Sequence, residues 1–223
     1  MQPDKSNSPL SLKRSRGGRP SATQAGDVDR RILQAATALF LQQGFEATGC
    51  EQVAIQAGAS KASLYARYAN KEALFEAVIR NYVQRSMAPM ADKTGQSTVQ
   101  IRLRAVGESL LAHSLQSEVI AMMRAVVTAV YRMPELSRLA YRIGRDHCVL
   151  QVAGAIAGEG FENTDVVAPA MAAAGKFVDL ALAPNQMRAL MGEEPAPLLE
   201  EARRGLDDSI AMLVKGGWLD GWK

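Results

Sequence analysis

The sequence predicts an all-α protein, and two observations carry that prediction. Helix-forming residues such as Ala, Leu, Met and Arg are plentiful, whereas aromatic residues make up only 5% of the 223-residue chain. Apolar residues recur at helical spacing along most of the chain, and no alternating β-branched run is long enough to predict a strand. We therefore expect an N-terminal helix-turn-helix domain followed by a C-terminal helical domain.

Composition divides the chain into three parts. Residues 1–20 are rich in Ser, Pro, Gly and basic residues and are expected to form a disordered basic arm. Helical periodicity then covers residues 21–88, which we assign to the first domain. The segment from Met87 to Thr98 is interpreted as a hinge or linker, and residues 97–223 form the second domain.

Capping residues delimit four helices in the first domain. A long helix is expected after Ser21, which has capping-box spacing with Gln24, and it should end at Gly44. A second helix is expected to start at Thr48, which has the same spacing with Glu51, and to close at Gly58. Two further helices follow, one capped by Ser60 and running to Tyr68, the other capped by Asn70 and ending by Pro89.

The second domain is predicted to contain at least five helices. The expected helices lie around residues 103–110, from 119 to 131, and from Pro134 towards Gly154 or Gly158. A loop is expected over residues 158–163, followed by a helix over about 166–182 and a break at Pro184. The last helix should run from about 197 to 215, where Gly216 and Gly217 stop it.

Charge and cysteine content narrow the classes of function. Residues 1–88 hold 12 Lys/Arg against 7 Asp/Glu, whereas the rest of the chain holds 14 against 16. A basic front joined to a mildly acidic back favours a polyanion-binding module attached to a second domain. Cys50 and Cys148 give neither a metal-binding spacing nor a disulfide framework. We see no signal peptide and no apolar run near the length of a membrane span, so we expect a cytoplasmic protein.

Enzymatic function is disfavoured by the motifs. No HExxH, GxSxG, Walker or GxGxxG pattern occurs in a plausible setting, and we expect neither catalytic residues, cofactor nor metal. The acidic pairs Glu200–Glu201 and Asp207–Asp208 are more simply solvated faces of the last helix.

The stretch from Phe45 to Phe75 carries the functional signal. Two short helices are separated by one Gly-containing turn and followed by a longer helix, which is helix-turn-helix spacing. Small residues occupy the turn, where two helices must cross closely: Ala54, Ala57, Gly58 and Ala59. The second short helix presents a face without acidic residues, as a negatively charged groove requires.

A joint pattern over residues 27–80 resembles the TetR family of bacterial regulators. The pattern comprises Arg31-Ile32-Leu33, Ala35-Ala36, Leu39-Phe40, Gly44-Phe45, Thr48, Val53-Ala54, Ala57-Gly58, Ser60-Lys61, Ser63-Leu64-Tyr65, Tyr68, Lys71-Glu72 and Leu74-Phe75. The chain departs from the family at Gln52-Val53, where an acidic residue and Ile are usual, and at Ala62, where Gly or Pro is common. The resemblance implies a DNA-binding transcriptional regulator, usually a repressor of a palindromic operator, that acts as a dimer.

The resemblance implies roles for individual residues. Lys61, Ala62 and Ser63 open the recognition helix and are expected to reach base edges in the major groove. Thr48, Tyr65, Arg67 and Lys71 are expected on the DNA side, with phosphate contacts from Thr48, Tyr65 and Lys71. Tyr68 is assigned either to a phosphate contact or to the core. Arg14, Arg16 and Arg19 resemble the core of an AT-hook and could enter a minor groove, although an untargeted basic tail is an equal alternative.

The second domain carries weaker signals. Met133–Leu136 and Phe177–Leu180 look like parts of AefR-like and AcrR-like members of the family. The resemblance implies a homodimer through helices near 165–183 and 197–215, and a pocket for a small apolar or amphipathic inducer. Candidate pocket residues, each of which is more simply interpreted as an ordinary core or surface residue, are His113, Met122, Met123, Tyr131, His147 and Phe177.

Two alternatives remain open at this stage. A regulator gated by a protein partner, or an architectural factor without a pocket, would have a closed and solid C-terminal core. Cys50, in the first helix of the motif, could make DNA binding sensitive to oxidation, against the simpler reading of a small half-buried residue.

Overall fold

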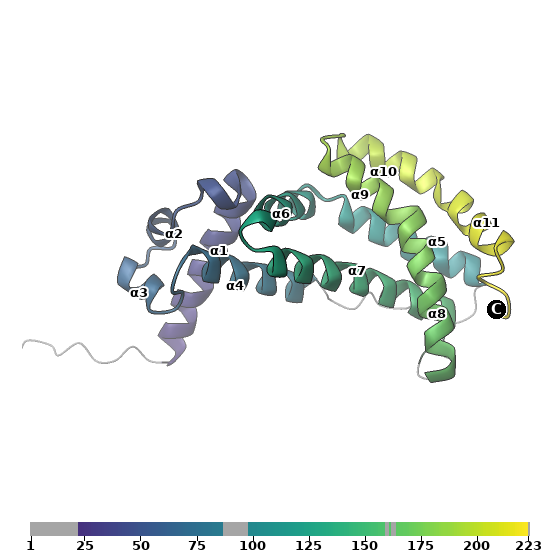
Figure 1. Ribbon diagram of the computed structural model, residues 1–223, viewed down its shortest axis with the longest axis horizontal. Coiled ribbons are helices and arrows are strands. Elements are labelled where there is room, and N and C mark those ends of the chain that lie inside the picture. Colours follow the sequence, from purple (N-terminus) through teal and green to yellow (C-terminus); the bar gives the residue numbers. More distant parts are fainter. Residues whose placement is uncertain (1–21, 87–97, 159–160, 162–163, 223) are drawn as a thin grey trace, which may run out of the picture.

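The structure, a computed structural model, describes residues 22–86, 98–158, 161 and 164–222. Within these ranges every regular element is a helix, as the sequence predicts. Figure 1 shows an elongated molecule with α1 to α4 at one end, α8 and α11 at the other, and α7 running between them. The basic arm and the linker over 87–97 lie outside the described residues.

Four helices form the N-terminal end: α1 (Ala22–Ala47), α2 (Cys50–Gln56), α3 (Lys61–Tyr65) and α4 (Lys71–Ser86). The C-terminal part begins with α5 (Val99–Ser114), α6 (Ser117–Thr128), the short turn η1 (Ala129–Tyr131) and α7 (Pro134–Ala157). It continues with α8 (Thr164–Phe177), a π-helical turn η3 (Val178–Leu182), α9 (Ala183–Leu190), α10 (Pro195–Arg204) and α11 (Leu206–Lys215).

Three phenylalanines form the centre of the N-terminal core. The ring of Phe75 from α4 lies 4.8 Å from Phe40 and 4.9 Å from Phe45, measured between centroids. All three side chains are almost completely buried. Phe45 reaches this cluster because Gly44 adopts a left-handed backbone (φ 80°), which kinks the end of α1. The prediction that Gly44 interrupts the first helix is therefore confirmed.

The N-terminal core also includes residues from helices of the second half of the chain. Met122, Ala125, Ala129 and Leu136, from α6, η1 and the start of α7, are buried in the same cluster as the phenylalanines. In addition, Arg132 forms an ion pair of 2.8 Å with Glu46 at the end of α1. The N-terminal end is thus packed directly onto the second half of the chain.

A second core lies between α5, α7, α8 and the last helices. Alanines on α8 allow it to lie close to its neighbours, and Ala170, Ala173 and Ala174 are fully or almost fully buried. Phe177 is completely buried, and a Cβ on Gly107 of α5 would lie only 2.9 Å from its ring. Arg102 donates to the carbonyl oxygens of Ala155 (2.6 Å) and Ile156 (3.1 Å), which fixes the end of α7 on α5.

Two predicted helix boundaries in this part are wrong. Helical structure continues through Pro184 to Leu190, because the π-helical turn η3 widens the helix just before the proline. Asn185 then donates to the carbonyl oxygen of Ala181 at 2.8 Å. The expected single helix over 197–215 is two helices, α10 and α11, that meet at Gly205.

One stretch, Val167–Leu190, is long and apolar enough on average (mean hydropathy 1.2) to meet the criterion for a membrane span. Inspection of the sequence did not indicate it, because Lys176, Asp179 and Arg188 interrupt the apolar run. One face of this stretch supplies buried residues to the C-terminal core.

Candidate nucleic-acid interface

The turn between α2 and α3 is built by two residues. Gly58 takes a left-handed conformation (φ 59°), which lets the chain reverse over the few residues from Ala57 to Ser60. The Ser60 hydroxyl oxygen then accepts a hydrogen bond from the Ser63 N–H at 3.0 Å and caps α3. Leu64 is fully buried and holds α3 on the core. The predicted helix-turn-helix is thus present, with α3 shorter than the predicted Ser60–Tyr68.

One face of α3 is open to solvent. Lys61 and Ala62 are exposed and the Tyr65 side chain is about half exposed, whereas Ser63 is half-buried. Lys61 forms an ion pair of 2.8 Å with Glu51 of α2, and this carboxylate raises the pKa of the lysine. This face can enter a groove of DNA. However, Lys61, the one cation on α3, is paired with Glu51, and the sequence analysis did not predict this ion pair.

Thr48 does not occupy its predicted position. α2 begins at Cys50 with Gly49 as its cap, and no Thr48–Glu51 capping box is present. The Thr48 side chain is 2% exposed, and its hydroxyl donates to the Gly44 carbonyl oxygen at 2.8 Å. The threonine therefore stabilises the kink at Gly44 and does not point its hydroxyl outward.

Arg67 and Tyr68 also face inward. The Arg67 guanidinium donates to the Ser63 carbonyl oxygen (2.8 Å) and hydroxyl (3.2 Å). The Tyr68 hydroxyl donates to the Asp29 carboxylate at 2.7 Å, and burial together with this bond raises the pKa of the phenol. Of the two roles considered for Tyr68, the structure shows the core residue.

Lys71 joins the first turn of α4 to the end of α1. Its ammonium donates to the carbonyl oxygens of Phe45 (2.9 Å) and Glu46 (3.1 Å) and lies 4.5 Å from the centroid of the Phe45 ring. Asn70 caps α4 as predicted, since its side-chain oxygen accepts from the Ala73 N–H at 2.8 Å. Two of the three ammonium protons of Lys71 are thereby used within the protein.

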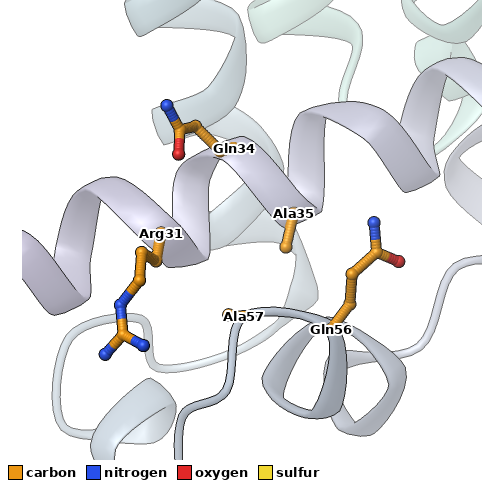
Figure 2. Close-up of a pocket in the computed structure, with 5 residues that line it drawn as sticks. All are labelled: Arg31, Gln34, Ala35, Gln56 and Ala57. Atoms are coloured by element: carbon orange, nitrogen blue, oxygen red, sulfur yellow. The ribbon is translucent and has the colours of Figure 1, made fainter.

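A small hollow opens beside the motif, between α1 and the end of α2. It measures about 240 Å³ and is lined by Arg31, Gln34, Ala35, Gln56 and Ala57. Figure 2 shows Arg31 and Gln34 extending from α1 and Gln56 from α2. The sequence pattern included Arg31 but gave it no role, because nothing in the spacing indicates that it lies beside the turn.

Comparison with known proteins explains this architecture. A family model described as bacterial regulatory proteins of the tetR family matches residues 32–78. A second model, the C-terminal domain of AefR-like transcriptional repressors, matches residues 101–215, which is more than half of the chain. The chain belongs to the TetR family. It is a DNA-binding transcriptional regulator and not an enzyme, and regulators of this family bind operator DNA and dimerise.

Individual TetR-family proteins resemble this chain in sequence over its N-terminal part and in structure over most of its length. The repressor ComR of Escherichia coli is 41% identical over 78 residues, which is 34% of this chain and 34% of ComR. The chain therefore spans about a third of that relative's length in sequence. A TetR-family regulator from Mesorhizobium loti is 23% identical, with a TM-score of 0.68 over 85% of this chain and 98% of that one. The flavonoid-responsive regulator FrrA is 26% identical, with a TM-score of 0.62 over 86% and 97% of the two chains.

The six residues predicted to line an inducer pocket in this TetR-family protein do not converge. Tyr131 is 96% exposed, and His113 is exposed as well. Met122 is buried in the N-terminal core, whereas its neighbour Met123 packs against the C-terminal core, because successive residues of α6 point about 100° apart around the helix.

Two of the six, His113 and His147, lie close enough to interact electrostatically. His147 is half-buried, and its pKa is lowered by burial and by the nearby charge of His113. Phe177 is completely enclosed by the C-terminal core. The set as a whole does not form one cavity wall.

Proposed function

We propose that this regulator is a cytoplasmic repressor that leaves a palindromic operator when a small apolar or amphipathic molecule binds its C-terminal domain. The observation that carries the proposal is the exposed face of α3, with Lys61, Ala62 and Tyr65 turned to solvent on a helix fixed by Leu64. A helix so held can lie in a major groove without rearranging the core.

Contacts to DNA divide between bases and backbone. Lys61 can donate to the O6 or N7 of a guanine, and the Ala62 methyl can contact a thymine methyl. The Ser63 hydroxyl can donate to an acceptor on either guanine or thymine. Tyr65 can donate to a phosphate, as can the remaining ammonium proton of Lys71. The side chains of Thr48, Arg67 and Tyr68 support this face from behind, and we assign them no direct contact.

A dimer is needed because one short recognition helix reads too few base pairs. Large apolar side chains remain exposed on the last helices, which supports an interface there: Leu180, Met187, Met191, Met212, Val214 and Trp218. The expected interface helices, near 165–183 and 197–215, correspond to α8 with η3 and to the pair α10 and α11.

Coupling to an inducer is supported by the position of α6. Its Met122 and Ala125 belong to the N-terminal core, while Arg124 donates to the carbonyl oxygens of Ala189 (2.8 Å) and Leu190 (3.4 Å) at the end of α9. A ligand that shifts α6 must therefore disturb both ends of the molecule. The match to AefR-like repressor domains and the flavonoid response in FrrA's name support a small-molecule signal.

The test is selection of bound fragments from the source genome by the purified protein, followed by footprinting. We expect a palindrome whose half-sites lie about 34 Å apart, one helical turn of DNA. Ala62→Glu should abolish binding because it puts a negative charge in the groove, whereas Ala105→Glu, on the exposed side of α5, should bind normally. Equal binding by both variants would refute the assignment of the α3 face.

A second candidate is a regulator gated by a protein partner. The close contact of Gly107 with Phe177 and Leu206 favours it, since this part of the C-terminal core is tightly packed. A panel of flavonoids and other apolar compounds titrated against the DNA complex separates the two. Release of DNA by one compound supports the inducer model, and release only by a protein from the source organism supports the partner model.

A further inference from the structure

The hollow between α1 and α2 has the chemistry of an oxyanion site. Its lining includes the guanidinium of Arg31, the carboxamide of Gln56, and Ala35 and Ala57, whereas the Gln34 carboxamide points to the opposite side of α1 from Ala57 (Figure 2). A guanidinium forks two N–H donors toward a phosphate or carboxylate, and a carboxamide adds further donors. No acidic side chain is among the lining residues.

Arg31 is the least engaged cation in the described part of the N-terminal domain. Within the described residues, its recorded polar partner is Asp27, at 3.6 Å, and Arg30 binds the same carboxylate more closely. The other cations of residues 26–82 have close partners: Arg30 with Asp27, Lys61 with Glu51, Arg67 with Ser63, Lys71 with Phe45 and Glu46, and Arg80 with Glu76. The Arg31 side chain is 43% exposed, so it can take another partner at little cost.

The position of the guanidinium points to the source of the oxyanion. A Cβ built on Gly58 would lie 3.4 Å from Arg31 Nη1, so the guanidinium sits directly against the turn that leads into the recognition helix. Gly58 is two residues before Ser60, the cap of α3. A backbone phosphate flanking the groove that α3 enters would pass near this turn.

We propose that Arg31 binds a backbone phosphate of the operator beside the α2–α3 turn. This inference rests on the proposed placement of α3 in the major groove. A contact of this kind adds affinity without sequence preference and orients the domain on the duplex. Gly58 contributes because its left-handed backbone (φ 59°) forms the tight turn against which the guanidinium lies.

The experiment measures DNA affinity of the full chain as a function of salt, with the footprinted operator fragment and with a random duplex of equal length. Arg31→Gln should weaken both complexes roughly tenfold and make the slope of log K against log salt shallower by about one. Arg30→Gln is the matched control, since it removes an adjacent positive charge that shares Asp27 but lies outside the hollow. It should change the affinity for either DNA less than twofold.

Two further measurements make each result decisive. Arg31→Lys should recover part of the affinity because it restores the charge without the fork. Inorganic phosphate, titrated at constant ionic strength, should not bind the free protein measurably at millimolar concentrations. Millimolar binding of inorganic phosphate that is lost in Arg31→Gln, together with an unchanged DNA slope, would overturn the proposal in favour of a site for a free oxyanion.

Equal effects of Arg31→Gln and Arg30→Gln would also overturn it, since net charge alone would then explain the loss. The Ala62→Glu variant separates this inference from the proposed function. If Ala62→Glu abolishes binding while Arg31→Gln does not weaken it, only the phosphate site fails. If neither variant has an effect, the placement of α3 fails as well.

Discussion

The two cores of this regulator are built from different side chains. The N-terminal core is centred on three phenylalanines whose rings lie within 6.0 Å of one another, on segments close in sequence. The C-terminal core uses alanines on α8 and a single phenylalanine, Phe177, to bring long helices together. The aromatic core holds a compact motif in one geometry, whereas the alanine-rich core depends on close approach between helices distant in sequence.

The largest expected effect is at the aromatic cluster. Phe75→Ala removes the ring that contacts both Phe40 and Phe45 and should lower the free energy of unfolding by about 3–5 kcal/mol. Urea unfolding followed by circular dichroism measures the loss, with Tyr131→Ala, at a 96% exposed side chain, as the control. Since α6 contributes to this core, we expect the transition to remain single. Two separate transitions would show that the cores are independent.

The second largest effect is expected at Gly107, where α5 lies close to Phe177 and Leu206 in the C-terminal core. Gly107→Ala places a methyl group 2.9 Å from both Leu206 and Phe177, so we expect a loss of about 1–2 kcal/mol despite the better helix propensity of Ala. The matched control is Gly144→Ala on α7, where no atom lies within 4 Å of the new Cβ. That variant should gain about 0.5–1 kcal/mol by the same unfolding measurement. A gain in stability for both variants would show that the C-terminal core rearranges at little cost to accommodate the added methyl group.

Lys71 tests how the aromatic core is linked to the DNA-binding surface. Lys71→Met should lower stability by about 1–2 kcal/mol, because the carbonyl oxygens of Phe45 and Glu46 lose a charged donor. It should also lower DNA affinity. A purely phosphate-binding lysine would leave thermal unfolding of the free protein unchanged, so the same melt distinguishes the two roles.

The smallest effect concerns His147. Its pKa is lowered by burial, so the unfolded chain takes up a proton at higher pH than the folded protein. Stability should therefore be fully present above the ordinary value of 6.5 and fall as the pH is lowered past it. His147→Gln should flatten the dependence of Tm on pH between about 8 and 5.5. His113→Gln should flatten it partly, because the pKa of His147 rises toward its ordinary value when the neighbouring charge is removed.

The sequence was most informative where structure is determined locally. Ser60, Asn70 and Gly58 act through hydrogen bonds or backbone angles within a few residues, and their roles could be predicted from spacing. Thr48 was misplaced because a threonine before a helix can cap that helix or bond backward to the preceding turn. Only the kink at Gly44, which turns the chain toward the hydroxyl, decides between the two.

Long-range packing explains the remaining differences. Whether Tyr68 faces DNA or the core depends on Asp29, 39 residues earlier in the chain. The proposed inducer residues are spread along four α-helices and the turn η1, and periodicity does not reveal that Met122 and Met123 face different cores. Arg31 was overlooked for the same reason, since its neighbour Gly58 lies in the α2–α3 turn, 27 residues later in the chain.

The burial of Met122, Ala125, Ala129 and Leu136 among the phenylalanines bears on how such regulators can be recombined. A chimera that exchanges DNA-reading modules at the linker, near residue 88, would leave those four side chains facing a foreign surface. A junction placed after Leu136 would carry both sides of the contact together. Evolution by domain exchange is subject to the same constraint. A new DNA-binding domain must already have a surface that packs against α6, or α6 must acquire matching substitutions.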